Sequence, residues 1–207
     1  MLIGYIVRHG ESRGNDLGIF RSGLDSPLTK KGIQQAKQAA EFLKDKPIAH
    51  IVSSPLLRAF ITAELISRDH DIVVYQHRAL FPWSLGVLTG LSKSDNQDAL
   101  DLFIDNPDVP LPSGSAVGES LNDFLDRELA FWEAALKMAR IAGLTVFVCH
   151  NSVILALDQI ITGRDAEIGE RELIAPGGIL EVHYDGKKYS LKAALGGLNE
   201  RKDISYS

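Results

Sequence analysis

Four side chains of two kinds could carry out phosphate chemistry. Arg8 and His9 stand in the stretch VRHGES, Arg58 in SSPLLRA and His150 in VCHNS. Two guanidinium groups can bind phosphoryl oxygens bidentately and offset their charge. A neutral imidazole beside such cations can act as the nucleophile, because positive charge disfavours its protonation, and a second imidazole can donate to the transferring group. These residue types therefore indicate cleavage of a phosphate ester through a phosphohistidine, with a solvated turn at Gly10 as the alternative for the first stretch.

The elements expected from the sequence would bring these side chains to one edge of a sheet. Short apolar runs indicate strands over residues 2–7, 48–52, 72–75 and 144–149, and a closing hairpin over 179–184 and 189–194. Helices are expected in between, beginning at Thr29, at Ser54-Pro55, at Ser120 and near residue 152. This alternation predicts an α/β fold with a mainly parallel sheet covered by helices on both faces. Functional sites in such sheets lie beyond the carboxyl ends of the strands.

Composition limits the class of protein. The 207 residues are 45% hydrophobic and 24% charged, without repeats or linkers, so a single domain over residues 1–207 is expected. A net charge of −5 with no basic run argues against a nucleic-acid partner. No 18-residue apolar segment and no signal-peptide pattern occur, so we expect no membrane partner and a cytoplasmic protein. No metal-ligand spacing is present, and neither a metal nor a cofactor is expected.

Several motifs in order along the chain resemble the histidine phosphatase superfamily, which is also called phosphoglycerate-mutase-like. The motifs are RHGES at 8–12, Asn15, LDSPLTKKG at 24–32, SSPLLRAFITAE at 53–64, VGES at 117–120 and VCHNSVILAL at 148–157. The resemblance implies a three-layer α/β/α sandwich in which His9 accepts the phosphoryl group. It also implies a phosphate pocket completed by Arg8, Arg58 and His150, with Asn15 and the backbone at Asn151 as further substrate contacts.

One position departs from the family pattern. Relatives of this branch carry a glutamate as general acid after the third strand, and the aligned position here is Pro82. The proton for the departing ester oxygen must then come from another residue or from water. Alternatively, an acidic leaving group needs no proton. Glu119 is the leading substitute, although a carboxylate at a helix N-terminus can instead interact with the helix dipole. Asp25 is a weaker candidate, and Trp83, beside the missing acid, is expected either in the core or in the pocket wall.

Three functions fit these residues. We expect a phosphomonoesterase that acts on a small phosphorylated metabolite, because both histidines and both arginines are present. A phosphoglycerate-type mutase is the enzymatic alternative, and a non-catalytic phosphate-binding protein of the same fold is the third. The region from 80 to 115 has no motif that identifies the substrate, and the sequence leaves open whether the chain forms a homodimer.

Overall fold

A computed structural model describes residues 1–114, 117–165, 168 and 172–197 of the chain. Its centre is a six-stranded sheet with the strand order β3-β2-β4-β1-β5-β6. The strands β1 to β4 run parallel to one another, β5 is antiparallel to its neighbour β1, and β6 is antiparallel to β5. Their bounds are Leu2–Arg8, His50–Ser53, Val74–Gln76, Thr145–Cys149, Ile174–Tyr184 and Tyr189–Gly197.

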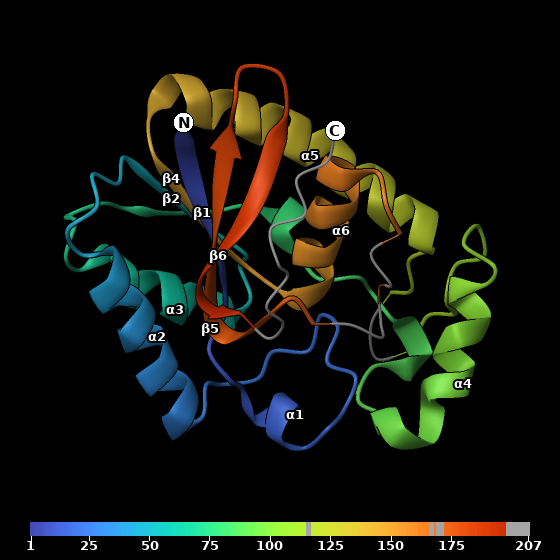
Figure 1. Cartoon of the computed structure of the whole chain (residues 1–207). Coiled ribbons are helices and arrows are strands. Elements are labelled where there is room, and N and C mark those ends of the chain that lie inside the picture. Colours follow the sequence, from blue (N-terminus) through green and yellow to red (C-terminus); the bar gives the residue numbers. More distant parts are fainter. Residues whose placement is uncertain (115–116, 166–167, 169–171, 198–207) are drawn as a thin grey trace.

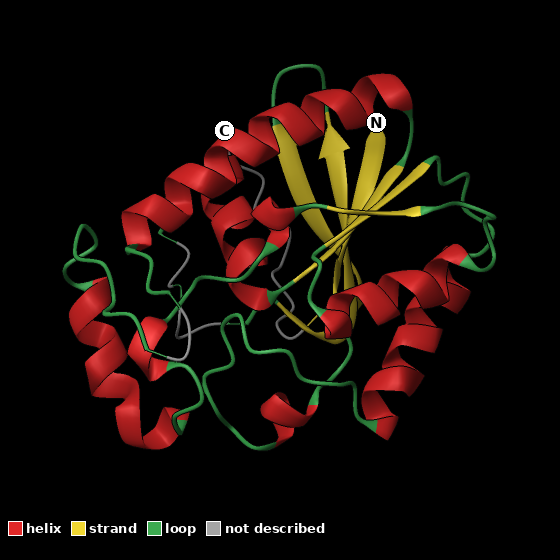
Figure 2. Cartoon of the chain, turned by 180° about the vertical axis from the view of Figure 1, so that it is seen from behind, coloured by secondary structure: helices red, strands yellow, loops and turns green. Residues whose placement is uncertain are grey.

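Helices cover both faces of the sheet (Figure 1). The helices α2 (Lys30–Leu43) and α3 (Leu57–Ser67) lie on one face, and α5 (Leu121–Ala142) and α6 (Asn151–Thr162) lie on the other. The short α1 (Arg13–Asp16) and α4 (Lys93–Ile104) lie beyond the carboxyl edge of the parallel strands, as the view from behind also shows (Figure 2). Two 3₁₀ turns, Arg78–Leu80 and Gly86–Leu88, lie in the segment after β3. The expected α/β/α sandwich around a mainly parallel sheet is confirmed.

The sheet is held between two apolar layers. Every residue of β4, TVFVC, is buried, as a strand covered on both faces requires. Against one face pack large rings, including Phe124 and Trp132 of α5. Against the other pack small side chains such as Ala39 and Ala63, which let α2 and α3 approach closely. None of the described helices is long and apolar enough to cross a membrane.

Two of the expected helix starts are confirmed by their capping hydrogen bonds. Thr29 Oγ1 accepts from the backbone N–H of Gly32 at 2.9 Å and begins α2. Ser120 Oγ accepts from the N–H of Asp123 at 3.0 Å and begins α5. Both bonds satisfy an N–H group that the helix itself leaves without a partner.

The expected start of α3 at Ser54-Pro55 is wrong by a few residues, because α3 begins at Leu57. The side chain of Ser54 bonds instead to His150, on the neighbouring strand exit. The N–H of Leu57 finds its partner in Asp25 Oδ1 at 2.9 Å, a residue far away in the sequence. Because this acceptor comes from a loop distant in the sequence, no residue next to Leu57 indicates where the helix begins.

Some segments differ from what the sequence indicated. The helix α4 was not expected, and it contains a kink at Asn96 and a single buried residue, Leu100, so its apolar pattern is weak. Gly177 and Gly178 lie inside β5 at an irregularity of the pairing, so the strand begins before the expected residue 179. In the irregular stretch before α5, residues 115 and 116 lie outside the described part of the chain.

A pair of glycines brings α2 directly against the loop after β1. A Cβ placed on Gly10 would lie 2.2 Å from the carbonyl oxygen of Gly32, and one on Gly32 would lie 1.9 Å from that of Glu11. Both distances are far below van der Waals contact. Neither glycine has positive φ, so the close approach of two backbones is what requires the missing side chains.

Candidate active site

The fold brings the four predicted residues together at the carboxyl edge of the sheet. Arg8 ends β1 and His9 follows it, while His150 follows β4, the neighbouring strand. Arg58 lies in the first turn of α3, which follows β2. The rings of His9 and His150 lie with centroids 5.0 Å apart. All four side chains are buried, with at most 3% of each residue exposed.

His9 is fixed at both its ring and its backbone. Its Nδ1 bonds to the carbonyl oxygen of Gly10 at 2.6 Å. A carbonyl oxygen only accepts, so Nδ1 carries the proton and Nε2 carries the lone pair. The backbone N–H donates to Cys149 at 3.1 Å, and the carbonyl accepts from Gly177 at 3.2 Å. This tautomer and position are those that a nucleophilic nitrogen needs.

The surroundings of His9 keep its imidazole neutral. Burial lowers its pKa well below the ordinary value of 6.5, and the positive charges of Arg58 and Arg21 lower it further. The hydrogen bond to Gly10 acts in the opposite direction but does not outweigh these effects. At neutral pH the ring therefore has its lone pair available.

His150 lies at the N-terminus of α6. Its Nε2 bonds to Ser54 Oγ at 2.8 Å, and its buried Nδ1 has no hydrogen-bond partner among the described residues. Burial lowers its pKa well below 6.5, with Arg58 and His9 adding to the effect. The N-terminus of a helix favours an anion, so this nitrogen and the first turn of α6, beginning at Asn151, are placed to bind phosphate.

The two arginines are held in place by backbone carbonyls. Arg58 donates to Leu24 at 2.7 Å and to Ser22 at 3.0 Å. Arg8 donates to Ile174 at 2.8 Å and to the carboxylate of Glu172 at 2.6 Å. The Nε atoms of both arginines are buried and have no partner among the described residues. Burial lowers the pKa of Arg58 to about 10, which still leaves it charged at neutral pH.

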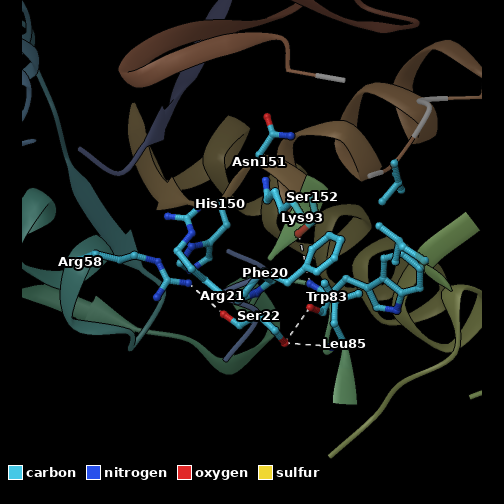
Figure 3. Close-up of a pocket in the computed structure, with 13 residues that line it drawn as sticks. Phe20, Arg21, Ser22, Arg58, Trp83, Leu85, Lys93, His150, Asn151 and Ser152 are labelled. Carbon is cyan, nitrogen blue, oxygen red and sulfur yellow. Dashed lines mark hydrogen bonds between the residues drawn. The ribbon is translucent and has the colours of Figure 1, made fainter. Parts of the chain in front are cut away.

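A cavity of about 110 Å³ opens beside these groups (Figure 3). Figure 3 shows Arg58, Arg21 and His150 on one side and the rings of Phe20 and Trp83 on the other. The cavity is lined by Phe20, Arg21, Ser22, Arg58, Pro82, Trp83, Leu85, Lys93, Leu100, His150, Asn151, Ser152 and Ile168. Arg8 and His9 are not among the lining residues, and His9 reaches the cavity wall through its contact with the His150 ring.

Pro82 and Trp83 both line the cavity, so the position of the missing glutamate faces the site. Trp83 is nevertheless almost fully buried, and its indole N–H donates to the carbonyl of Glu119 at 3.0 Å. Both expectations for this ring, packing and pocket wall, are therefore met by the same residue.

Glu119 does not line the cavity. Its carboxylate accepts two hydrogen bonds from Arg127, at 2.9 and 3.1 Å, and one from the N–H of Ser84 at 3.3 Å. Asp25, the weaker candidate, is exposed and caps α3 through Leu57. The structure thus brings neither of the predicted proton donors to the cavity wall.

Asn15 is also placed behind the wall. Its Oδ1 accepts from the N–H of Ser12 at 2.9 Å and from the guanidinium of Arg21, which also donates to Ser12 Oγ at 2.9 Å. Asn15 therefore orients Arg21, and Arg21 faces the cavity.

Arg21 and Lys93 are two cations that sequence reasoning missed. Burial, together with the charges of Arg58 and Arg8, lowers the pKa of Arg21 to about 9. Lys93 is exposed on its helix, and the partial desolvation of its ammonium group lowers its pKa, with Arg21 as the second cause. Arg21 stands in an irregular loop and Lys93 in the unexpected α4, so no spacing connected either residue to the histidines.

The chain is similar to known proteins both in sequence and in fold. The family model described as "Histidine phosphatase superfamily (branch 1)" matches residues 4–194. "Putative phosphoserine phosphatase 2" of Hydrogenobacter thermophilus is 32% identical over 189 residues, covering 90% of this chain and 92% of that protein. "Probable phosphoglycerate mutase GpmB" of Escherichia coli O1:K1 is also 32% identical, covering 89% and 86%. The crystal structure of the α-ribazole phosphatase from Shigella flexneri has the same fold, with a TM-score of 0.78, 24% identity and coverage of 94% and 96%.

Proposed function

Because the chain belongs to branch 1 of the histidine phosphatase superfamily, we propose that this phosphoric monoester hydrolase acts through a phosphohistidine formed on His9. The observation that carries the proposal is the hydrogen bond from His9 Nδ1 to Gly10, which leaves the lone pair on Nε2. That nitrogen belongs to a ring beside His150, and the ring interacts electrostatically with the buried Arg58 and Arg8. Small phosphorylated molecules are the substrates that a cavity of about 110 Å³ accommodates.

The reaction proceeds in two displacements. In the first, the lone pair of His9 Nε2 attacks phosphorus, and the ester oxygen departs with the electrons of the P–O bond. Arg58 and Arg8 stabilise the charge on the phosphoryl oxygens, and His150 donates to one of them. In the second, water attacks the phosphohistidine, releases phosphate and restores the neutral imidazole. The protein accelerates both steps mainly by positioning the reacting groups and by stabilising the charge on the phosphoryl oxygens.

The test is the covalent intermediate. During turnover of p-nitrophenyl phosphate, rapid quenching and peptide mass spectrometry should find the phosphoryl group on His9. His9→Ala should remain folded and lose activity by about three orders of magnitude or more, as loss of a nucleophile does elsewhere. His183→Ala is the matched control, because His183 lies in β5 and pairs with Glu181. Label on another residue, or an active His9→Ala variant, would contradict the proposal.

The second candidate function is a phosphoglycerate-type mutase, which the relative named phosphoglycerate mutase favours. A mutase would return the phosphoryl group from His9 to the second hydroxyl of its substrate. Incubation with 3-phosphoglycerate and a bisphosphoglycerate primer separates the two functions, since a mutase forms 2-phosphoglycerate and a phosphatase releases phosphate. Anion binding with no turnover of any ester would indicate a binding protein instead.

A further inference from the structure

The cavity combines a surplus of positive charge with a wall that offers no acid. We propose that the preferred substrate is a phosphoanhydride, in which the transferred phosphoryl group is joined to a second phosphate that Arg21 and Lys93 bind as it departs. This inference rests on the proposed function, because it uses the same nucleophile.

The wall of the cavity provides no strong proton donor. Its described lining residues include no carboxylate, and Pro82 stands where relatives place one. Ser22 Oγ donates to the carbonyl of Trp83 at 3.1 Å, and Ser152 Oγ accepts from the N–H of the same residue at 3.1 Å. The O–H of Ser22 is therefore used within the wall, whereas Ser152 is only an acceptor in this bond; a serine hydroxyl is in any case a weak acid.

The chemistry of the leaving group then decides between substrates. An alkoxide needs a proton as it departs, and a general acid typically contributes about 10²–10⁴-fold to such a reaction. A phosphate leaves as a stable anion and needs none. A site without an acid loses little on an anhydride and much on an alkyl ester.

The positive charge exceeds what one phosphoryl group requires. Arg21 uses the hydrogen bonds described for it on the neutral oxygens of Ser12 and Asn15. Lys93 and Arg21 interact electrostatically with each other and with Arg8, and Glu172 is the carboxylate that acts on both.

The balance of these groups matches a linked pair of phosphates. The positive side chains that line the cavity are Arg21, Arg58 and Lys93, and behind its wall Arg8 is paired with the carboxylate of Glu172. Because the Arg8–Glu172 pair is neutral as a whole, the three lining cations leave an excess of three positive charges. Two linked phosphates carry roughly three negative charges, since each contributes about 1.5 to 2 at neutral pH. A single phosphoryl group would leave part of this charge uncompensated in a partly buried site.

The proposed step is balanced without any further reactant. His9 Nε2 attacks the terminal phosphorus, the bond to the bridging oxygen breaks, and its electron pair leaves on the second phosphate. Arg21 and Lys93 stabilise that developing charge. Water then cleaves the phosphohistidine, so that pyrophosphate and water give two phosphates and the original enzyme.

Three substrates test the proposal with the wild-type chain. We expect kcat/KM for inorganic pyrophosphate to exceed that for glycerol 1-phosphate by about a hundredfold or more, the lower end of the acid contribution. If p-nitrophenyl phosphate is cleaved but pyrophosphate is no better than glycerol 1-phosphate, the inference is overturned and the phosphatase assignment stands. If neither p-nitrophenyl phosphate nor pyrophosphate is cleaved, the proposed function itself has failed. A preference for 3-phosphoglycerate over pyrophosphate would assign the extra cations to a carboxylate and also overturn the inference.

Substitutions of Arg21 and Lys93 provide a second test of the proposal. Lys93→Gln and Arg21→Gln should each lower kcat/KM for pyrophosphate about tenfold or more, as loss of a charged hydrogen bond does, and lower that for p-nitrophenyl phosphate much less. Arg21→Lys should recover part of the loss. Lys137→Gln, at an exposed position of α5, is the matched control and should change neither.

Two sources of error have to be excluded: an unstable variant and a contaminating enzyme. Arg21 supports a loop through Ser12 and Asn15, so Arg21→Gln should also lower stability. Lys93 is exposed on its helix, so if Arg21→Gln does not fold, Lys93→Gln decides alone. His9→Ala, purified in parallel, must release no phosphate from pyrophosphate, which excludes a contaminating pyrophosphatase. Equal losses on both substrates in Lys93→Gln would contradict a role on the leaving phosphate.

Discussion

Single residues at the site owe their ionisation to burial more than to their partners. For both His9 and His150, burial is the first cause of the lowered pKa, and neighbouring arginines are the next. A nucleophile that stays neutral in acid keeps its lone pair at pH values where an exposed histidine is mostly protonated. The arginines that are placed to bind phosphate therefore also help to keep His9 neutral.

The protonation state of His9 and His150 can be measured by NMR titration. In the folded chain, the ring signals of His9 and His150 should show no protonation as the pH falls through 6.5, whereas the same residues in urea should titrate near 6.5. Vanadate should shift the folded titration upward, because a bound anion favours the imidazolium. Since the unfolded chain takes up more protons below 6.5, the free energy of unfolding should also decrease there. A folded-state pKa at or above 6.5 would contradict the environment described for either ring.

The sequence predicted these residues to different extents. His9, Arg8, Arg58 and His150 were predicted because each stands at or just beyond the carboxyl end of an expected strand. Arg21 has no such position, and only the folded loop brings it back to the cavity. Glu119 is the leading substitute for the missing acid in the sequence, but its partner Arg127 could not be foreseen from one sequence.

Among the elements, α5 holds the segment that carries the pocket wall. Arg127 of α5 donates to the carbonyl of Ala79 at 2.8 Å and pairs with the carboxylates of Glu119 and Glu128, each at 2.9 Å. Its guanidinium also lies 5.0 Å from the ring centroid of Phe124. One side chain thus connects the helix to the segments on both sides of the cavity wall.

Substitution of Glu119 tests this role. Glu119→Gln should lower the free energy of unfolding by about 1–2 kcal/mol, since it weakens charged hydrogen bonds that are partly buried. It should slow p-nitrophenyl phosphate and glycerol 1-phosphate by the same factor, because a wall that shifts affects every substrate. Asp126→Asn, at an exposed position of α5, should change neither quantity. A selective loss on glycerol 1-phosphate would restore Glu119 as the proton donor.

Elements with a local signal were predictable, and those without one were not. Thr29 and Ser120 cap their helices with their own side chains, and a cap of this kind is visible in sequence. The start of α3 depends on Asp25 from another loop, and α4 packs through a single fully buried residue. Tertiary contacts set these boundaries.

At the scale of the whole molecule, the site joins both layers of the sandwich. Arg58 comes from α3 on one face of the sheet, and His150 begins α6 on the other. An anion between them contacts both layers at once. Its binding energy should therefore stabilise the whole fold, because only the folded chain assembles the site.

Thermal unfolding measures this coupling. Vanadate or phosphate at a hundredfold excess over its Kd should add about 2.7 kcal/mol of stability and raise Tm by about 5 °C or more for a chain of this size. Arg58→Gln should lose most of the shift, and Lys137→Gln should keep it. Sodium chloride of equal ionic strength controls for screening. An unchanged shift in Arg58→Gln would place the anion elsewhere.

The contact between Gly10 and Gly32 has a consequence for how this enzyme could diversify. Gly10 supplies the carbonyl that sets the tautomer of His9, and its position depends on a helix whose own glycine fits against it. A methyl group at either position would separate the two backbones and disturb the nucleophile. The residues that face the departing group, such as Pro82 and Lys93, belong to a different stretch of chain. Mutation and selection can therefore explore new substrates through residues 80–93 while positions 10 and 32 stay fixed, so a directed-evolution library should randomise the former and spare the latter.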